Sequence, residues 1–386
     1  MKKVLLVATV QSHIAQFHKP LIAWLADAGC QVDVAAKDNL SLKPNLHLDI
    51  QGTKYDIPFE RSPFSLKNLK AYFQLKKVIN EGDYDIIHCN TPVGGILARL
   101  AANTKRKRGD LKVIYQAHGF HFYQGGPKKN WFLWYPIEKW FSRYTSVLIT
   151  INKMDHALAK KRFHAECVAY VPGVGLDLSR FACPEQSLDL RKEFSLPDDA
   201  KIIISVGELN RNKNQQVIIR ALAHTNDKKM HYFLVGNGPE ENALRQLSEQ
   251  LGVALQVHFL GYRRDVPALL KNADVYAFPS RREGLGMASI EAMASGLPLV
   301  TSNRHGINDY SEDGITGFKY DPDDYQGFAE GIVKIAYDDV LKGQMGANNI
   351  EVSKRYSLDA SMRELTQVYR RLLENGCEGY SHSSCI

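Results

Sequence analysis

The stretch "ADVYAFPSRREGLGMASIEAMASGLPLVTS", residues 273–302, gives the clearest indication of the fold class. It begins and ends with short apolar runs, 273–280 and 297–302, of the kind that forms buried strands. Between them lie Gly284 and Gly286, then an apolar segment of helical character, which Gly296-Leu297-Pro298 terminates. A strand, a glycine turn, a helix and a second strand form one unit of a parallel α/β sheet.

The same alternation continues on both sides of this stretch. Strand-like runs in the first half are "CQVDVAA" and the residues 3–10, 84–90, 112–118, 146–152 and 167–173. Further runs in the second half are 201–207, 231–238, 257–262 and 316–320. Helix-like sequence separates them, for example at 18–29 and 65–82. The pattern predicts an α/β fold of two Rossmann-like domains that face a central cleft, with ligands at the carboxyl ends of the strands.

The boundary between the domains is expected where the alternation breaks, in the proline-containing region 172–200. A chain of 386 residues is also longer than a single core usually supports. We predict an N-terminal Rossmann-like domain over 1–175, a C-terminal one over 176–356, and a helix with a tail over 357–386. The helix "SLDASMRELTQVYRRLLENG" (357–376) has no strand after it, so we expect it to pack back on the first domain.

Composition predicts a cytoplasmic protein. Hydrophobic residues make up 44% and charged residues 24%, which is ordinary for a soluble chain. No run approaches the ~20 apolar residues of a membrane-spanning helix, and "VLLVATV" near the start lacks a signal-peptide cleavage site. The six cysteines include no C-x-x-C pair, which favours reduced thiols over a disulfide framework or a zinc site.

The whole chain has a net charge of +7. Its basic clusters and a stretch rich in aromatic residues lie in the first half. The basic clusters are "KRKR" (105–108), Lys128-Lys129 and "KKR" (160–162). Close by, "WFLWYPIEKWF" (131–141) mixes tryptophans with apolar residues. Two interpretations carry equal weight: packing in the core, or docking to an anionic membrane surface. No nucleic-acid-binding motif accompanies the charge, so nucleic acid is not an expected partner.

Several motifs together resemble one enzyme family. They are "SVGELNRNKN", "FLVGNGPEENALRQLSE", "FLGYRRDVPALLKNADVYAFPSRREGLGMASIEAMASGLPLVTSN" and "DGITGF". They resemble the family-4 retaining glycosyltransferases, which have the GT-B fold of two Rossmann-like domains. In the first half, "SHIAQFHKP", "RSPFSLKNLKAY", "HCNTPVGGILARLAA" and "AHGFHFY" resemble the bacterial exopolysaccharide and capsule transferases of that family. The resemblance covers nearly the whole chain.

The resemblance implies a function for each domain. The first domain would lie on the acceptor side, and the second would bind the nucleotide sugar. The enzyme would transfer a hexose or N-acetylhexosamine, from a donor that is most often UDP-linked in this family, to a lipid-linked saccharide. The product would belong to exopolysaccharide, capsule or O-antigen synthesis, and the protein would associate peripherally with the anionic inner face of the plasma membrane. No cofactor is implied.

The glycine turn and the two glutamates around it have a physical interpretation. Exposed backbone N–H groups near Gly284, Leu285 and Gly286, together with the helix N-terminus, can bind a diphosphate. Glu291 lies about five residues into the helix, ~7 Å along its axis. The resemblance implies that Glu283 binds sugar hydroxyls and that Glu291 binds the ribose. The alternative is an ordinary glycine turn followed by two surface glutamates.

A cation is needed beside the diphosphate, and the resemblance assigns this role to Lys213 in "ELNRNKN". Such a lysine would stabilise the charge that develops on the leaving group. The family usually has an arginine five residues earlier, where this chain has Glu208. We expect Arg211 to supply the missing charge and Glu208 to pair with Arg211 or Lys213.

Further candidates follow from the resemblance. Backbone groups near Arg263 in "LGYRRD" (260–265) would contact the nucleobase, and Gly236 of "GNGP" would form a glycine-rich turn at the nucleotide. Both residues also fit purely structural roles. His118 would contact the donor sugar from the opposite domain; His121 and His13 are weaker candidates.

The loop "TVQSHIAQF" lacks the glycine pair found in many family members. Ser12 and His13 either replace that pair at the donor phosphate or face the acceptor.

Metal and NTP-hydrolysis motifs are absent from the sequence: there is no H-E-x-x-H and no Walker lysine. Asp321-Pro322-Asp323 has D-x-D spacing but follows a glycine turn and is interpreted as a loop. Two functional alternatives stay open. One is a nucleotide-sugar epimerase of the same fold; the other, motivated by Glu208, is a non-catalytic nucleotide-sugar-binding subunit of a transferase pair.

Overall fold

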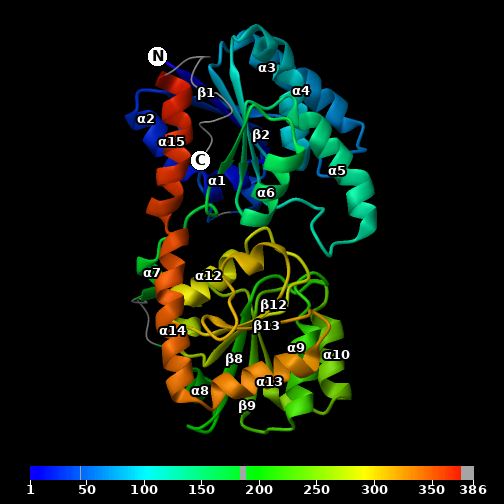
Figure 1. The fold of residues 1–386 in the computed structure, drawn as a ribbon, viewed down its shortest axis with the longest axis vertical. Helices are drawn as coiled ribbons and strands as arrows, with labels where there is room; N and C mark the ends of the chain where they lie inside the picture. The colour runs from blue at the N-terminus through cyan, green and yellow to red at the C-terminus, as the bar shows by residue number, and fades with distance from the viewer. Residues whose placement is uncertain (44, 183–187, 375–386) are drawn as a thin grey trace. The chain divides into compact units, whose positions relative to one another are not determined.

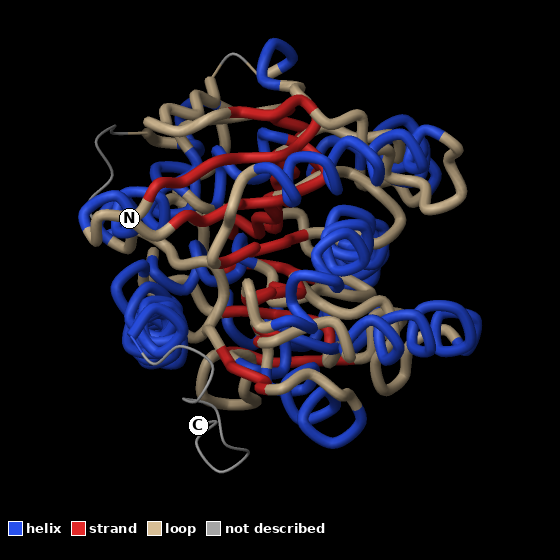
Figure 2. Tube along the Cα trace, turned by 90° about the horizontal axis from the view of Figure 1, so that it is seen from above, coloured by secondary structure: helices blue, strands red, loops and turns tan. Residues whose placement is uncertain are grey.

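The computed structural model describes residues 1–43, 45–182 and 188–374. The chain forms two compact units: Met1–Val174 together with the segment that begins at Ser361, and Gly175–Ala360 (Figure 1). Each unit contains one parallel sheet with helices packed against it, and Figure 2 shows the strands lying between helices. The predicted pair of Rossmann-like domains is confirmed.

The first sheet has seven strands in the order β3-β2-β1-β4-β5-β6-β7. They are β1 (Lys3–Val10), β2 (Gln31–Lys37), β3 (Lys54–Asp56), β4 (Ile86–Asn90), β5 (Lys112–Ala117), β6 (Val147–Thr150) and β7 (Cys167–Tyr170). The helices of this unit are α1 (Gln11–Phe17), α2 (Lys19–Asp27), α3 (Lys67–Glu81), α4 (Pro92–Arg108), α5 (Lys128–Ser142) and α6 (Lys153–Arg162).

Alternating side chains of β1 explain why this sheet is covered on both faces. Leu6 packs in a core cluster with residues of α1 and α2, whereas Leu5 packs in the opposite cluster with residues of α3 and α4. Both side chains are fully buried. Successive residues of a strand point to opposite faces, so an uninterrupted apolar run is what a sheet buried on both faces requires.

The second sheet has six strands in the order β10-β9-β8-β11-β12-β13. They are β8 (Lys201–Val206), β9 (Met230–Val235), β10 (Val257–Gly261), β11 (Val275–Phe278), β12 (Leu299–Ser302) and β13 (Gly317–Tyr320). Its main helices are α9 (Gln216–Thr225), α10 (Glu241–Gln250), α11 (Val266–Lys271), α12 (Met287–Ala294), α13 (Tyr325–Ala336) and α14 (Asp339–Ser353). The stretch 273–302 forms β11, α12 and β12, as predicted.

The last helix of the described residues, α15 (Leu358–Glu374), returns to the first unit, as predicted. Leu365, Val368, Tyr369 and Leu372 are buried in the same core cluster as Leu6. The Tyr369 hydroxyl also lies 2.8 Å from Nδ1 of the buried His88 in β4. Residues of α15 therefore complete the core that β1 begins.

Three features differ from expectation. The segment interpreted as a loop after β1 forms the helix α1, and the short strand β3 was not predicted. Reduced thiols were expected throughout, but Cys167 is disulfide-bonded. Among the helices of the described residues, none has both the length and the apolar character of a membrane span.

Candidate functional site

The loops that follow β8 and β11 lie side by side in the second unit. These two strands are neighbours in the sheet, at the position where the strand order reverses. The Arg281 backbone N–H donates to the Asn212 carbonyl at 2.7 Å, and Asn212 Nδ2 donates to the Arg282 carbonyl at 2.9 Å. In open α/β sheets ligands bind outside the carboxyl ends of the strands at such a reversal.

Lys213 and Glu283 meet across these two loops. Lys213 Nζ lies 2.7 Å from Glu283 Oε1, and their side chains are only 20% and 14% exposed. The ammonium also lies 4.7 Å from the centre of the Phe278 ring. The structure thus joins the two residues predicted to act on the phosphate and on the sugar into one partly buried ion pair.

The turn before α12 needs a glycine at 286. Gly286 has φ of +92°, and a Cβ atom there would lie 2.8 Å from the Phe278 ring and 2.8 Å from the Tyr310 hydroxyl. Gly286 is the N-cap of α12, so the backbone N–H groups of the first helical turn follow it directly. Leu285 between the two glycines is buried, with 2% of the residue exposed.

Glu291 lies in α12, where burial raises the pKa of its carboxyl to about 7, while the charge of Arg180 opposes this shift. The carboxyl therefore changes charge near neutral pH. Arg180, in the short helix α7 (Ser179–Ala182), was not predicted as part of the site. No motif marks it, because it belongs to the irregular segment between the two sheets.

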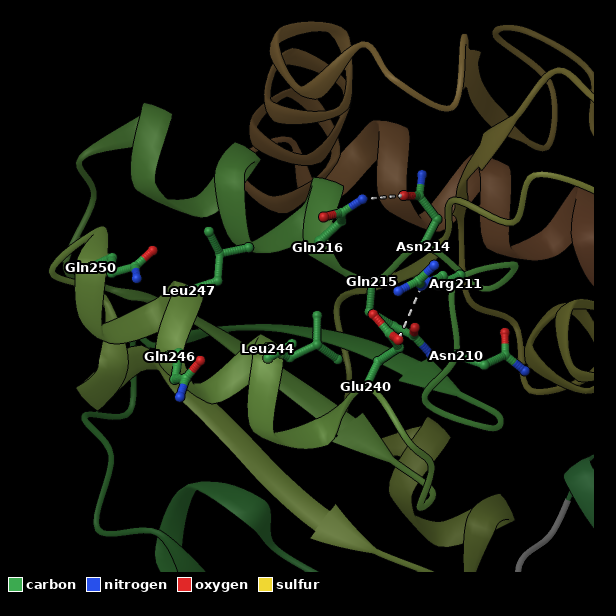
Figure 3. A pocket seen from close by; sticks show the side chains of 11 residues that line it. Asn210, Arg211, Asn214, Gln215, Gln216, Glu240, Leu244, Gln246, Leu247 and Gln250 are labelled. Atoms are coloured by element: carbon green, nitrogen blue, oxygen red, sulfur yellow. Dashed lines mark hydrogen bonds and ion pairs between the residues drawn. The ribbon is translucent and has the colours of Figure 1, made fainter.

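Arg211 does not join the Lys213–Glu283 pair. Its Nε lies 3.4 Å from Glu240 Oε1, and its side chain is 92% exposed. Arg211 is one of the residues that line a pocket of about 210 Å³, together with Leu244 and Leu247 of α10. Figure 3 shows it paired with Glu240 there. Lys213 does not line this pocket. The prediction that Arg211 supplies charge next to Lys213 is not supported by this arrangement.

Glu208 is exposed, and its carboxylate accepts a hydrogen bond of 2.9 Å from Asn210 Nδ2. The expected ion pair with Arg211 or Lys213 is wrong, because those cations bind Glu240 and Glu283 instead. Glu208, which stands where the family usually has an arginine, is therefore hydrogen-bonded to the side-chain amide of Asn210.

Arg263 and Gly236 have clear structural roles. The Arg263 guanidinium donates to both oxygens of Asp265, at 2.8 and 2.5 Å, and these bonds raise its pKa above the ordinary value. Gly236 has φ of +137°, and a Cβ there would lie 2.1 Å from the Gly207 carbonyl oxygen. Close approach of the ends of β8 and β9 therefore requires this glycine.

Both aspartates of the D-x-D segment, Asp321 and Asp323, form ion pairs with arginines. Asp323 accepts from Arg281 at 2.5 and 3.1 Å, and Asp321 pairs with Arg304. Its interpretation as a loop agrees with the structure, in which it lies between β13 and α13.

His118 follows β5 in the first unit, and its Nε2 lies 3.0 Å from Asn90 Oδ1 at the end of β4. The rings of His13 and His118 are 4.8 Å apart, and those of His18 and His88 are 5.4 Å apart. Burial lowers the pKa of His18 and His118 well below the ordinary value, and that of His13 to about 4.

The histidine cluster was missed because its members are far apart in sequence. His13 follows β1, His88 belongs to β4 and His118 follows β5. Placing the carboxyl ends of these neighbouring strands together would have revealed it. Ser12, the other candidate after β1, exchanges two hydrogen bonds with Asn39, at 3.0 and 2.9 Å.

Comparison with known proteins identifies the family of the chain. The family described as "Glycosyl transferases group 1" matches residues 186–352, and "Glycosyl transferase 4-like" matches residues 3–152. A putative glycosyltransferase, EpsD of Bacillus subtilis, is 38% identical over 378 residues, 97% of each chain. The UDP-Gal:alpha-D-GlcNAc-diphosphoundecaprenol alpha-1,3-galactosyltransferase of Escherichia coli is 28% identical over 72% of each chain.

Solved structures share the fold at low sequence identity. HepE of Anabaena, in complex with UDP and glucose, has a TM-score of 0.76 and 20% identity, covering 96% of this chain and 99% of its own. Sucrose-phosphate synthase of Thermosynechococcus elongatus has a TM-score of 0.77 and 20% identity, covering 97% and 100%. The match to EpsD over nearly its full length and the two family matches place the chain in the group 1, glycosyltransferase 4-like family, and it is a glycosyltransferase.

Proposed function

We propose that this enzyme is a retaining glycosyltransferase. It transfers a hexose or N-acetylhexosamine from a UDP-linked donor to a lipid-linked saccharide, in the synthesis of exopolysaccharide, capsule or O-antigen. The observation that carries the proposal is the Lys213–Glu283 pair at the reversal point of the second sheet, next to the glycine turn of α12. The cation and the helix N-terminus can bind the two phosphates of a nucleotide sugar, and the carboxylate can bind hydroxyls of its sugar.

In this proposal the residues divide the donor among them. The Lys213 ammonium and the N–H groups after Gly286 stabilise the diphosphate as it leaves. Glu283 accepts hydrogen bonds from sugar hydroxyls, Glu291 accepts them from the ribose, and His118 is a further proposed sugar contact. The attacking hydroxyl approaches from the face that the diphosphate leaves, so the departing oxygen takes its proton and the anomeric configuration is kept.

The relatives support the choice of donor and acceptor. HepE has been crystallised with UDP-glucose, and the E. coli relative uses UDP-galactose and a diphosphoundecaprenol-linked acceptor. A lipid-linked acceptor lies at a membrane surface, so peripheral association with the anionic inner face of the plasma membrane is part of the proposal. The exposed apolar side chains of α5, Phe132, Leu133 and Trp140, are its proposed contact.

The experiment incubates the purified enzyme with UDP-, GDP- and ADP-linked sugars, each with and without diphosphoundecaprenol-linked saccharides. We expect release of UDP only when the lipid-linked acceptor is present, and a product that keeps the donor's anomeric configuration. Conversion of the donor into another nucleotide sugar without acceptor would instead show an epimerase. Donor binding with transfer only after a second protein is added would show a non-catalytic subunit.

A further inference from the structure

Histidine side chains gather at the carboxyl edge of the first sheet. His13 in α1, His18 between α1 and α2, and His118 after β5 each offer one ring nitrogen, and these three nitrogens lie within 4.8 Å of one another. Here too the strand order reverses, between β1 and β4. Four of the thirteen histidines of the chain, these three and His88, lie in contact at one place.

Several nitrogens of this cluster make no hydrogen bond although they are buried. His18 is 2% exposed, and neither of its ring nitrogens makes a hydrogen bond of normal geometry, although the Asn90 side chain is close enough to raise its pKa against the effect of burial. The same holds for Nε2 of His13. A buried polar atom without a partner costs roughly 1–3 kcal/mol, so two such histidines facing each other need an explanation.

Asn90 orients the third histidine. His118 Nε2 lies 3.0 Å from Asn90 Oδ1, so this nitrogen carries the proton and Nδ1 keeps its lone pair. Histidines that bind a metal usually donate their other N–H to an oxygen in this way, which fixes the tautomer and the ring orientation. Asn90 itself is fully buried at the end of β4.

We propose that His13, His18 and His118 bind a divalent transition metal ion of the zinc class. Zinc–nitrogen distances of about 2.0–2.1 Å place tetrahedral nitrogen ligands about 3.4 Å apart, so the rings need to close by about 1.4 Å at most. Burial keeps these imidazoles neutral, which is the state that coordinates a metal. Imidazole nitrogens favour zinc, cobalt, nickel or copper over magnesium and calcium, which take oxygen ligands.

His13 and His118 keep some exposed surface, but His13 Nε2 and both His18 nitrogens are buried, so an ion reaches the site only when these rings move. A water molecule can then complete its coordination. The three ligands all lie in the first unit, and one of them, His118, is also the proposed sugar contact. If His118 also contacts the donor sugar, metal and sugar compete for it, and zinc is then expected to inhibit transfer.

The test measures metal binding directly on the full-length protein, stripped with chelator and with its reactive thiols blocked by iodoacetamide. Isothermal titration with Zn²⁺ is expected to show one equivalent bound by the wild type. His13→Gln and His18→Gln are each expected to weaken this binding at least tenfold, because each removes one of three ligands. His156→Gln, a partly buried histidine of α6 outside the cluster, is the matched control and is expected to bind like the wild type.

Cobalt gives an independent readout. The Co²⁺-loaded wild type is expected to show the visible absorption of a tetrahedral site without a thiolate-to-cobalt charge-transfer band, and His13→Gln is expected to lose it. Circular dichroism of each variant confirms that it is folded. Equal Zn²⁺ affinity in wild type and in folded His13→Gln and His18→Gln would overturn the proposal, as would a thiolate band that persists in them.

Discussion

Lys213 Nζ and Glu283 Oε1 lie 2.7 Å apart and form an ion pair between the loops that follow β8 and β11. Glu283→Gln keeps the shape of the side chain and removes its charge. Since the lost hydrogen bonds to donor and lysine are charge-assisted, the expected effect is ~1.5–3 kcal/mol, roughly ten- to a hundredfold in kcat. Steady-state kinetics with the lipid-linked acceptor measure it.

Glu249→Gln is the matched control, since Glu249 is an exposed glutamate of α10. It is expected to keep full turnover and the same Tm. If Glu283→Gln also turned over at the wild-type rate, the assignment of Glu283 to the donor sugar would be wrong.

Lys213 is expected to be coupled to Glu283 and independent of Arg211. Lys213 and Glu283 share an ion pair, so their double-mutant cycle for UDP binding should show non-additivity. Arg211 binds Glu240 instead, and its cycle with Lys213 should be additive within about 0.5 kcal/mol. UDP affinities of the alanine variants, measured by isothermal titration, decide between them. Strong coupling of Lys213 to Arg211 would show that both contact the phosphates.

Glu291 provides a prediction about pH. Burial raises its pKa from 4.5 to about 7, so at pH 7 about half of the carboxyls are protonated. Ribose hydroxyls donate to the ionised form, so UDP lowers this pKa and releases about half a proton at pH 7. Titration in two buffers of different ionisation enthalpy measures the release, which Glu291→Gln should abolish. Proton uptake, or equal release by the variant, would contradict the proposed ribose contact.

The sequence predicted which residues belong to the candidate site, but not which side chains they pair with in the folded protein. Glu283, Lys213 and Gly286 stand in strong local motifs, and the structure brings them together. The pairing of Arg211 with Glu240 and the charge of Arg180 near Glu291 depend on side chains that meet only after folding. Glu208 was expected to need a cation, but an exposed carboxylate is stable in water with one amide donor.

At the scale of elements, the predicted core packing of the aromatic α5 sequence is confirmed for part of its side chains, and membrane docking stays a proposal. Trp131, Trp134 and Tyr135 pack against the core, whereas Phe132 is 90% exposed and Trp140 is 54% exposed. On its buried side, Glu138 binds the Arg99 guanidinium at 3.0 Å. The helix is therefore fixed by one face and leaves apolar side chains free on the other, as an interfacial helix requires.

Replacing Phe132 and Trp140 with Ser should weaken binding to anionic vesicles without lowering stability, since both side chains are exposed. Leu255→Ser is the matched control, because Leu255 is 91% exposed in the second unit. Vesicle sedimentation measures binding, and the Tm measures stability. If the control lost as much binding as the α5 variant, α5 would not be the membrane contact.

The basic cluster beside α5 is smaller than its sequence suggests. Lys105 pairs with Asp83 and Arg106 with Glu166, so only Lys107 and Arg108 of "KRKR" are exposed. Each exposed cation contributes ~1 kcal/mol at most towards anionic lipid. The sequence shows where basic residues are concentrated. It does not show which of them form ion pairs, because the partner carboxylates come from distant segments of the chain.

The strands were predictable because each is a short, nearly continuous apolar run, which is typical of parallel sheets buried on both faces. The helix α1 could not be predicted in this way, because it has only seven residues and no side-chain hydrogen bond at its N-cap. β3 has three residues, and none of them is buried. Such elements are formed by their tertiary surroundings and leave little local signal.

At the scale of the whole molecule, each unit has its own sheet and its own core, and α15 brings the chain back to the first. The second unit contains four of the residues proposed to contact the donor: Lys213, Glu283, Gly286 and Glu291. UDP is therefore expected to stabilise this unit chiefly. At a hundred times its Kd, a ligand adds about 2.7 kcal/mol of stability to the state that binds it.

Hydrogen exchange with and without saturating UDP locates this stabilisation. We expect the greatest slowing in peptides that cover 205–216 and 281–294, because these segments hold the loop of Lys213 and the first turns of α12. Lys213→Ala should reduce the slowing in both segments at the same UDP concentration, since it removes the cation that the diphosphate needs. Peptides around His13 and His118 belong to the other unit, so slowing that was greatest there would place the nucleotide in the first unit and would contradict the proposed donor site.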